Sequence, residues 1–410
     1  MSEWSLIRLG ALAEVKGGKR LPKGELLTSI PSAHPYVRIT DMQDKWLNIN
    51  ENTIYVNPNI QHAIRNYTVD RGDVILSIVG HTIGLVARIG ETLHKANLTE
   101  NCVKILPDTT KLDKDFIYYF LVSNIGQSEI DSKIVGSSQP KLPLYNIKDI
   151  ELPFPILPEQ KAIASVLSSL DDKIDLLHRQ NKTLEAMAET LFRQWFIEEA
   201  KEDWEECRLG DLIEIKGGFS YKGEFIGYGD SLLLGMGCVS FDNRFLSTGA
   251  RQYAGTCSER FYAQPGDIVI ATRQQSDNLP ILGFPAMIPD DYKGKNVIVG
   301  TNLYSLKNHS DLSNRLIFQI FRSKDYRSHI IASAKGSTVR MITKDAIEDF
   351  CFSMPDVETI NKLELHLDSL VSKLNENFKQ IQTLENLRDT LLPKLMSGEV
   401  RVQYQTEEVA

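Results

Sequence analysis

Residues 163–195 read IASVLSSLDDKIDLLHRQNKTLEAMAETLFRQW, and apolar side chains recur along this stretch at alternating spacings of four and three residues. The same spacing returns in residues 363–395. A seam sustained over more than four heptads is typical of a long helix that packs against a partner helix, although a helix packed on its own domain is the alternative. We expect Pro393 to end the second helix, because proline lacks the amide proton that a helix needs. The seam positions are Ile163, Leu167, Leu170, Ile174, Leu177, Asn181, Leu184, Ala188, Leu191 and Trp195, and then Leu363, Leu367, Leu370, Leu374, Asn377, Ile381, Leu384, Arg388, Leu391 and Leu395.

Each seam is interrupted by an asparagine at a different place, Asn181 in the first and Asn377 in the second. If the two helices pair antiparallel with full overlap, these two residues face each other. Two buried amides can satisfy one another, and a polar pair inside a coiled coil fixes its register. The sequence therefore predicts an intramolecular antiparallel coiled coil with Asn181 and Asn377 as its register pair.

The chain also repeats itself at an offset of 200 residues. The stretch WSLIRLGALAEVKGG, starting at Trp4, matches WEECRLGDLIEIKGG, starting at Trp204, at nine of fifteen positions. The offset returns near the end of each half, where Gly136 matches Gly336 and Ile147 matches Ile347. Because the halves share their ends and differ in their middles, we expect one scaffold that carries two different surfaces.

Each half is expected to form a compact domain with a mixed β-sheet and one or two helices. Short apolar runs broken by Gly, Pro, Asn and Asp predict the strands, and helical periodicity predicts the helices. Together with the two long helices, this gives an α+β fold with a pseudo-twofold internal repeat. The predicted strands include 74–79, 103–106, 268–272 and 303–306, and the predicted short helices are 115–123 and 312–322. The predicted segments are domains 1–156 and 200–355, helical spacers 157–199 and 356–400, and a tail 401–410.

The composition excludes several classes of protein. Apolar residues make up 42% and charged residues 24%, as in ordinary globular proteins, and no run of about 18 apolar residues predicts a membrane span. The first residues lack the basic and apolar regions of a secretory signal. Five scattered cysteines without a C-x-x-C pair argue for reduced thiols in the cytoplasm.

The net charge of −8 argues against a nucleic-acid partner until its distribution is considered. Residues 157–206 hold twelve acids and six bases, a net of −6, so the other 360 residues carry about −2. A DNA-binding surface on the two domains is compatible with this distribution. The acidic stretch can also be the solvated face of a helix.

No catalytic signature was found in the sequence. It contains no G-x-x-x-x-G-K-[ST] phosphate loop, no Pro-Pro dipeptide of the kind found in adenine methyltransferase loops, and no histidines at metal-ligand spacing. Glu14 and Lys16 form an E-x-K pair, but no suitable carboxylate precedes them as in a nuclease. We therefore expect no catalytic residue, metal or cofactor in this chain.

Three loops at equivalent places in the two halves carry residue types that contact DNA. Arg, Lys, Asn, Gln, Ser and Thr read base edges, and Lys, Arg and backbone amides hold phosphates. Polar loops also occur simply because they are solvated, so the argument depends on the recurrence of all three. In the first half the candidates are Lys16, Lys19, Arg20, Lys23, Ser77, His81, Thr82, Lys133, Ser137, Gln139 and Lys141. In the second half they are Lys216, Tyr221, Lys222, Thr272, Arg273, Gln274, Gln275, Asn278, Lys335, Ser337, Thr338 and Arg340.

Over nearly its whole length the chain resembles the specificity (S) subunits of Type I restriction-modification systems. The motifs that carry the resemblance are GDVILS at 72–77, LPFPILPEQ at 152–160 and LRDTLLPKLMSG at 387–398. The second half departs from the pattern at MPDVE, residues 354–358, where the usual Pro-x-x-Glu-Gln is degraded. This departure leaves the start of the second long helix less well defined.

The resemblance implies that each domain is a target recognition domain for one half of a split, asymmetric DNA sequence. The helices would set the gap and dock two modification (M) subunits, which carry S-adenosylmethionine and methylate adenine. Restriction (R) subunits would add translocation and cleavage that depend on ATP and Mg. The alternative from another class is a scaffold whose coiled coil binds proteins and whose domains bind no DNA.

The two helices are expected to act as a ruler between the half-sites. From position 163 to 195 is 32 steps, or about 48 Å at about 1.5 Å per residue. This length exceeds the roughly 34–36 Å of one DNA turn. The domains are therefore expected to lean inward, or the helix axis to tilt from the DNA axis.

Overall fold

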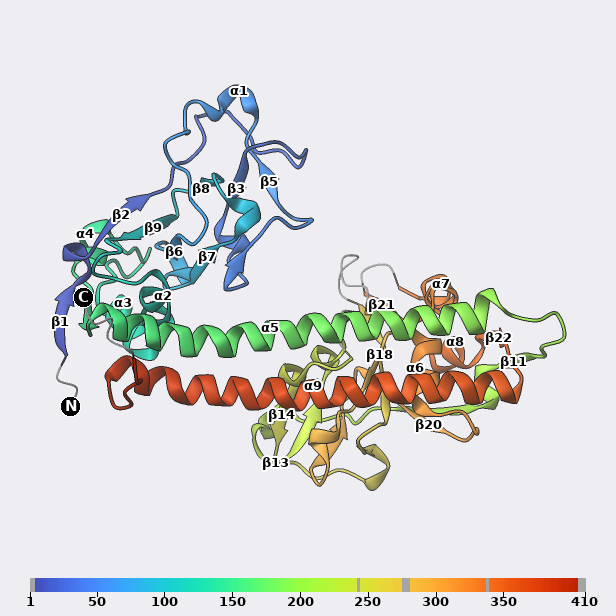
Figure 1. Ribbon diagram of the computed structural model, residues 1–410. Helices are drawn as coiled ribbons and strands as arrows, with labels where there is room; N and C mark the ends of the chain where they lie inside the picture. Colours follow the sequence, from blue (N-terminus) through green and yellow to red (C-terminus); the bar gives the residue numbers. More distant parts are fainter. Residues whose placement is uncertain (1–3, 242–243, 275–280, 337–338, 405–410) are drawn as a thin grey trace. The chain divides into compact units, whose positions relative to one another are not determined.

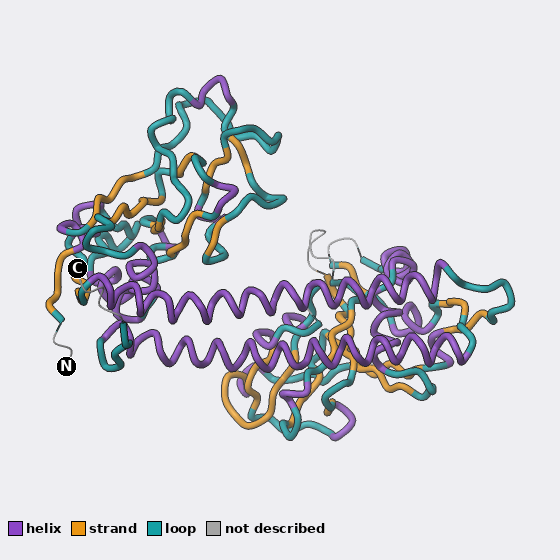
Figure 2. The backbone as a smooth tube through the Cα atoms, viewed as in Figure 1, coloured by secondary structure: helices purple, strands orange, loops and turns teal. Residues whose placement is uncertain are grey.

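The computed structural model describes residues 4–241, 244–274, 281–336 and 339–404. The chain divides into two compact units, residues 1–175 with 382–410, and residues 176–381. Each unit combines one β-rich globular domain with a segment of each of two long helices (Figures 1 and 2). Among the described residues, no helix is both long enough and apolar enough to cross a bilayer.

The two long helices are α5 (Leu157–Arg193) and α9 (Val357–Ser397), and they lie side by side (Figure 1). Their contacts run antiparallel, because Asp171 meets Arg388 in the first unit and Asn181 meets Asn377 in the second. Asn377 donates from Nδ2 to Asn181 Oδ1 at 2.9 Å, and both side chains are buried. The predicted antiparallel coiled coil and its register pair are therefore confirmed.

The expectation that Pro393 ends the second helix is wrong, because α9 continues through it to Ser397. A proline removes one backbone hydrogen bond, but near a helix end little of the helix depends on that bond. Leu395 and Met396, which follow it, are 2% and 0% exposed in the core of the first unit. Their burial holds the last turn in place until Gly398, whose φ of +72° ends the helix.

The first unit contains a five-stranded mixed sheet, a three-stranded mixed sheet and a two-stranded ribbon. The strand orders are β2-β9-β6-β7-β4, β5-β3-β8 and β1-β10, with β4/β7 and β3/β8 parallel. The strands are β1 (Ser5–Arg8), β2 (Ala13–Gly17), β3 (Pro35–Val37), β4 (Trp46–Leu47), β5 (Ile54–Tyr55), β6 (Val74–Ser77), β7 (Val86–Ile89), β8 (Asn97–Leu98), β9 (Cys102–Pro107) and β10 (Glu151–Phe154). The helices are α1 (Pro58–Gln61), α2 (Lys114–Val122), α3 (Asn124–Ser132) and α4 (Leu144–Lys148).

The second unit repeats this plan with longer strands in its outer sheet. Its described strands form the orders β12-β20-β16-β18, β14-β13-β19-β15, β11-β22 and β17-β21, with β13/β19 parallel. The strands are β11 (Glu206–Arg208), β12 (Ile213–Gly217), β13 (Ile226–Leu234), β14 (Ala250–Tyr253), β15 (Tyr262–Ala263), β16 (Ile268–Ala271), β17 (Arg273–Gln274), β18 (Pro285–Met287), β19 (Asn296–Val299), β20 (Leu303–Asn308), β21 (Arg340–Met341) and β22 (Cys351–Ser353). The helices are α6 (Asn314–Arg322), α7 (Lys324–Ser333) and α8 (Lys344–Glu348), and a π-helical turn, Gln194–Glu198, follows α5.

Each unit has more short helices than the one or two predicted. Helices α3 and α7 begin directly after α2 and α6, and their N-cap residues are Ser123 and Ser323. Each serine side chain accepts a hydrogen bond from a backbone amide of the first turn. A serine at this position separates one helix from the next, which periodicity alone does not reveal.

One apolar core in each unit joins the globular domain to the long helices. In the first unit, Leu167 of α5 and Met396 of α9 share a core with Phe120 of α2. In the second unit, Leu367 of α9 and Phe196, just after α5, share a core with the globular domain. Each domain is therefore packed on both helices at once.

Candidate nucleic-acid interface

In the first unit the structure brings together two of the three predicted loops. Val79 forms a β-bridge with Lys141, and the Gly80 amide donates to the Pro140 carbonyl at 3.0 Å. The Leu142 amide donates to the Ile78 carbonyl, also at 3.0 Å. The loop after β6 and the loop before α4 therefore lie side by side.

The second unit joins the equivalent loops in the same way. β17 pairs antiparallel with β21, so that Arg273 faces Met341 and Gln274 faces Arg340. The Ile342 amide donates to the Thr272 carbonyl at 3.1 Å. The same two loops meet in both halves although their sequences differ.

The first predicted loop meets the second at a turn that the sequence did not single out. In the first unit, the Lys19 amide donates to the Leu98 carbonyl, and the Ile78 amide donates to Asn101 at the far end of this turn. A Cβ at Gly18 would lie 2.1 Å from the Thr99 carbonyl oxygen. The glycine is therefore needed for close approach of two backbones, and we find no phosphate-binding loop there.

The second unit builds the same turn from 300–302. A Cβ at Gly218 would lie 2.0 Å from the Gly300 carbonyl oxygen, and the Thr272 amide donates to the Asn302 carbonyl at 3.1 Å. The sequence held one signal for this turn, an asparagine directly before β9 and directly before β20, at Asn101 and Asn302. In each unit the first and second candidate loops thus meet at one turn, and the third lies beside the second.

A groove opens beside this turn in both units. In the first it has a volume of about 660 Å³, and its lining includes Arg20, Lys23, Arg38, Thr40 and Asn101. Sequence reasoning missed Arg38 and Thr40, which are far from the predicted loops along the chain.

The groove of the second unit has a volume of about 300 Å³. Its lining includes the predicted Tyr221 together with Arg251, Thr301 and Asn302, which were not predicted. Arg251 is exposed.

The predicted cations of the first unit differ in how strongly they are already engaged. Arg20 donates to Glu100 at 2.6 Å, and this hydrogen bond raises the pKa of Arg20. Lys16 pairs with Glu14 at 2.6 Å, and Lys133 lies 4.0 Å from Glu129. The Lys19 ammonium lies 5.6 Å from the ring centroid of Tyr67. Within the described part of the chain, Lys23 and Lys141 are exposed and have no carboxylate partner.

In the second unit, Lys216 and Lys222 each have a nearby glutamate, at 3.5 Å and 3.9 Å. Arg273, Lys335 and Arg340 are exposed, and none pairs with a carboxylate of the described residues. These three cations lie on the paired loops, so their charge is available to an anionic ligand.

Two predicted contact residues are buried, and we correct their assignment. Ser77 is 0% exposed, and its Oγ lies 3.0 Å from Thr82 Oγ1, which is itself partly buried and donates to the Val79 carbonyl at 2.9 Å. Thr272 is 6% exposed and donates to the Asn302 carbonyl at 3.1 Å. Both side chains are buried and form hydrogen bonds within their own unit, so they stabilise the loops and do not face a ligand.

Of the remaining candidates, His81, Ser137 and Gln139 are exposed on the loops of the first unit. Gln275, Asn278, Ser337 and Thr338 lie outside the described residues, and only the backbone of Gln274 is described.

Metal ligands and disulfides were also considered in both units. No group of three or more His, Cys, Asp or Glu side chains among them could hold a metal ion. The five cysteines are free thiols. What recurs in both units is a polar, partly cationic loop cluster beside a groove.

The sequence matches the family model of the Type I restriction modification DNA specificity domain twice, over residues 1–186 and 201–386. The chain is 22% identical to the Type I restriction enzyme MjaVIII specificity subunit of Methanocaldococcus jannaschii, over 98% of this chain and 94% of that protein. It is 24% identical to the MjaIX specificity subunit of the same organism, over 70% and 69%. The crystal structure of a Type I restriction-modification S subunit from M. genitalium shares the fold, with a TM-score of 0.57 and 18% identity over 96% of each chain. The chain, with two such domains on an antiparallel pair of helices, therefore belongs to the Type I restriction-modification specificity subunit family.

Proposed function

We propose that each globular domain reads one half of a bipartite, asymmetric DNA target. The observation that carries the proposal is the repeated loop cluster, which is built twice on equivalent strands from different residues. A shared framework with different exposed side chains is what two unrelated half-sites require. Cations and amides on such loops match the acceptors of guanine and the donor–acceptor pair of adenine in the major groove.

The reading chemistry of the second unit centres on Arg273. Its exposed guanidinium lies on β17, whose pairing with β21 fixes the backbone. A guanidinium held this way can donate two parallel hydrogen bonds to one guanine. Lys222, at the first loop, is placed to hold a phosphate instead, which contributes affinity without sequence preference.

We further propose that the chain is not itself catalytic and acts through M subunits carrying S-adenosylmethionine and R subunits using ATP and Mg. A surface that fits the M subunit recurs on the two helices. Met187 and Leu387 are equivalent in the repeat and are 48% and 44% exposed. Thr190 and Thr390 are likewise equivalent and exposed. These positions point outward and are not part of the seam between the helices. Packing within the helix pair therefore does not explain why the two helices carry similar residues there.

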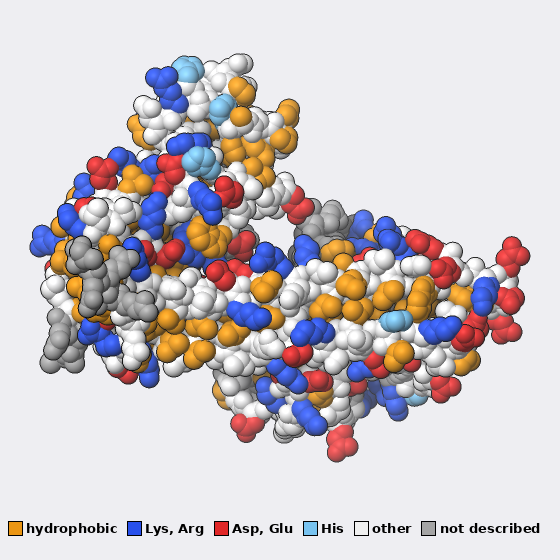
Figure 3. Space-filling model, viewed as in Figure 1, with side chains coloured by type: hydrophobic (Ala, Val, Ile, Leu, Met, Phe, Trp, Pro, Cys, Tyr) orange, Lys and Arg blue, Asp and Glu red, His pale blue; other side chains and the backbone are white. Residues whose placement is uncertain are grey.

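Apolar side chains gather over both α5 and α9 on the face shown in Figure 3. Each of these two surfaces also includes one exposed acidic residue, Glu189 on α5 and Asp389 on α9. Such a surface fits a partner with an apolar centre and basic edges. Two equivalent surfaces, one on each long helix, fit two copies of one M subunit.

Met187→Glu and Leu387→Glu test this docking surface. Each is expected to remove one M subunit from the complex, and the double variant both, as native mass spectrometry would measure. Leu365→Glu is the matched control, because Leu365 is 72% exposed and its repeat equivalent is Ser165. Full assembly by the double variant would exclude this surface.

The spacer role is tested by inserting four residues near Asn181, which adds about 6 Å to α5. The expected target keeps both half-sites and gains a gap longer by about one or two base pairs. An active variant with an unchanged gap would show that the helices do not set the spacing.

The function as a whole is tested by reconstituting the chain with an M subunit from the same host and mapping methylated positions. We expect methylation of one bipartite motif by the complex and none by the chain alone. Sequence-independent methylation, or turnover by the isolated chain, would contradict the proposal. A complex that assembles without retaining DNA would favour a protein scaffold.

A further inference from the structure

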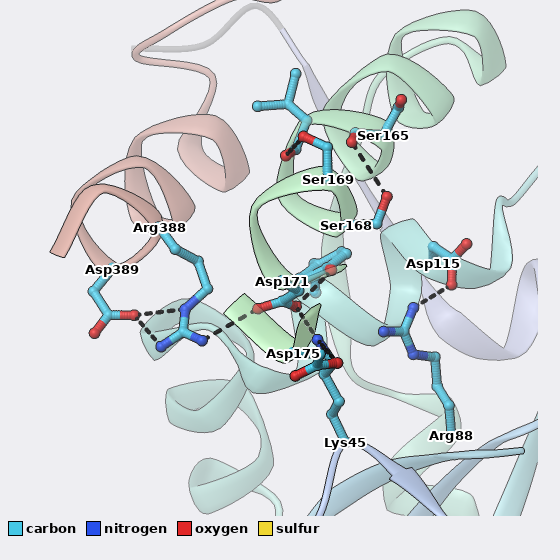
Figure 4. A network of polar contacts seen from close by, with 12 residues as sticks. Lys45, Arg88, Asp115, Ser165, Ser168, Ser169, Asp171, Asp175, Arg388 and Asp389 are labelled. Carbon is cyan, nitrogen blue, oxygen red and sulfur yellow. Dashed lines mark hydrogen bonds and ion pairs between the residues drawn. The ribbon is translucent and has the colours of Figure 1, made fainter. Parts of the chain in front are cut away.

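A buried carboxylate connects the first globular domain to both long helices (Figure 4). Asp171 of α5 is 4% exposed, and a buried charge is tolerated only when it is fully partnered. Tyr119 donates its hydroxyl to Asp171 Oδ2 at 2.8 Å, and Arg388 donates from Nη1 to Oδ1 at 3.2 Å. The Lys45 ammonium lies 3.7 Å from Oδ2. Both oxygens of the carboxylate are thus engaged.

The partners of Asp171 come from separate parts of the unit. Tyr119 belongs to α2, Lys45 directly precedes the edge strand β4, and Arg388 belongs to α9. Lys45 reaches α5 a second time through Asp175, at 2.8 Å. Asp171 is therefore the point where two elements of the domain and two helices meet.

The Lys45 anchor is itself held rigidly. The Arg88 amide of β7 donates to the Lys45 carbonyl at 2.8 Å. The Arg88 guanidinium carbon lies 4.1 Å from the ring centroids of both Trp46 and Tyr118, and its Nη1 lies 2.5 Å from Asp115. A shift of Asp171 relative to Lys45 would have to move β7 and α2 as well.

The second unit has no carboxylate at the position equivalent to Asp171. The repeat places Val371 where the first unit has Asp171, and Ala188 where it has Arg388. Both are buried, at 3% and 2% exposure. At these two positions the second joint is apolar.

Polar contacts at the second joint use other positions. Arg322 of α6 lies 3.7 Å from Glu185 of α5. The residue that corresponds to Lys45 is Arg244, since the Met287 amide donates to its carbonyl just as the Arg88 amide does to that of Lys45. The guanidinium carbon of Arg244 lies 5.0 Å from the centroid of the Phe318 ring. The two joints therefore differ in chemistry although their strands correspond.

We propose that Asp171 is a positioning residue that fixes the orientation of the first recognition domain on the helix pair. It thereby narrows the range of gap lengths between the two half-sites that the complex accepts. Hydrogen bonds and ion pairs weaken steeply away from their preferred geometry, whereas apolar contacts are non-directional. A joint in which one carboxylate has three directional partners restricts the orientation of the domain. This inference rests on the proposed reading function.

The test measures methyl transfer by the complex with its M subunits on duplexes that carry the native gap or a gap one base pair longer or shorter. In Asp171→Asn, the rate ratio between native and altered gaps should fall about tenfold, in line with the usual strength of a charged hydrogen bond. The preference for the bases of the first half-site should stay unchanged. Asp172→Asn is the matched control, because Asp172 is the exposed neighbour on the same helix, and it should leave the ratio at the wild-type value.

Tyr119→Phe provides a milder variant if Asp171→Asn fails to assemble, and its ratio should fall about threefold, as expected for one lost hydrogen bond. A lower melting temperature with an unchanged ratio would show that Asp171 only stabilises the fold, and would overturn the proposal. Altered base preference at the first half-site would overturn it as well. Failure of the wild-type complex to methylate any bipartite site would instead refute the proposed function, so the two failures are distinguishable.

Discussion

The central sheets of the two units share the strand order β2-β9-β6-β7 and β12-β20-β16-β18, and the sheets beside them share the order β5-β3-β8 and β14-β13-β19 but differ in the length of their strands. The first unit has the short strands β5-β3-β8, and the second has β14-β13-β19-β15, in which β13 alone covers nine residues. The central sheets contribute to the cores that contain the long helices, and the sheets beside them border the grooves. The part of each domain that must fit the helices is kept, and the part that is free of them has diverged.

The grooves show what this divergence changes. The groove of the first unit, about 660 Å³, is bordered by Arg20 and by Leu26, which is 82% exposed. That of the second, about 300 Å³, is backed by Tyr221, whose ring lies edge-on to Tyr253 at 6.4 Å. Different volumes and side chains on the same framework are expected to read different bases.

Exchanging the second domain tests this division most strongly. Replacing residues 200–355 with those of a relative should change one half of the methylated motif completely and leave the other half intact. The contacts between the first domain and its helix segments are unaffected by the exchange. Methylome sequencing of a host carrying the chimera gives the answer, and a change in both halves would refute the division.

Equal packing in the shared core predicts equal losses of stability. Leu167 and Leu367 are equivalent and both 0% exposed, so Leu→Ala at either should lower the free energy of unfolding by about 2–5 kcal/mol. Urea denaturation measures both, with Leu365→Ala as an exposed control expected to change it by less than about 0.5 kcal/mol. A difference above about 2 kcal/mol between the two core variants would mean that the units are not packed alike.

The register pair predicts a smaller and non-additive effect. Asn181→Val leaves the buried Asn377 amide with only the long 3.5 Å contact to Gln180 Oε1, at a cost of about 1–3 kcal/mol. Each amide already has one atom without a partner among the described residues, Asn181 Nδ2 and Asn377 Oδ1. The double substitution to valine should therefore recover that loss, as a double-mutant cycle by urea denaturation would detect. Additive losses would show that the two amides are energetically independent.

The smallest effects separate base reading from phosphate binding in the second unit. Arg273→Ala should lose about 1–3 kcal/mol of binding to the cognate target only. Lys222→Ala should weaken binding to all sequences and flatten the salt dependence by about one unit of slope. Fluorescence titration with cognate and scrambled duplexes at several salt concentrations measures both. Equal, sequence-independent losses would remove Arg273 from the base-reading residues.

The long helices and their pairing could be predicted because the heptad seam and the place of Asn181 and Asn377 depend only on periodicity. The repeat likewise exposed the shared framework. Burial at the strand ends could not be predicted, because every residue of β6 and β16 is buried and no alternation of inner and outer faces marks where the buried stretch stops. Ser77 and the adjoining Thr272 are therefore internal although they are polar.

Residues that border the grooves were hidden for another reason. Arg38 and Arg251 lie in the segments where the two halves no longer match, so no repeat marks them. They approach the predicted loops only after the outer strands have paired. The Asp171 joint was also missed, because its partners are brought together from residues 45 to 388 by tertiary structure.

The first unit is built from two separate segments of the chain, and this has a consequence for its biosynthesis. Its core includes Leu395 and Met396, and Arg401 lies 2.5 Å from the buried Glu159. These residues leave the ribosome more than two hundred positions after the domain they complete. While the second domain is being translated, the nascent first domain exposes the apolar surface that α9 later covers, so it cannot mature before α9 is made and is open to chaperone capture. A translation stop at residue 381 would release a chain whose second unit is complete and whose first unit still exposes that surface.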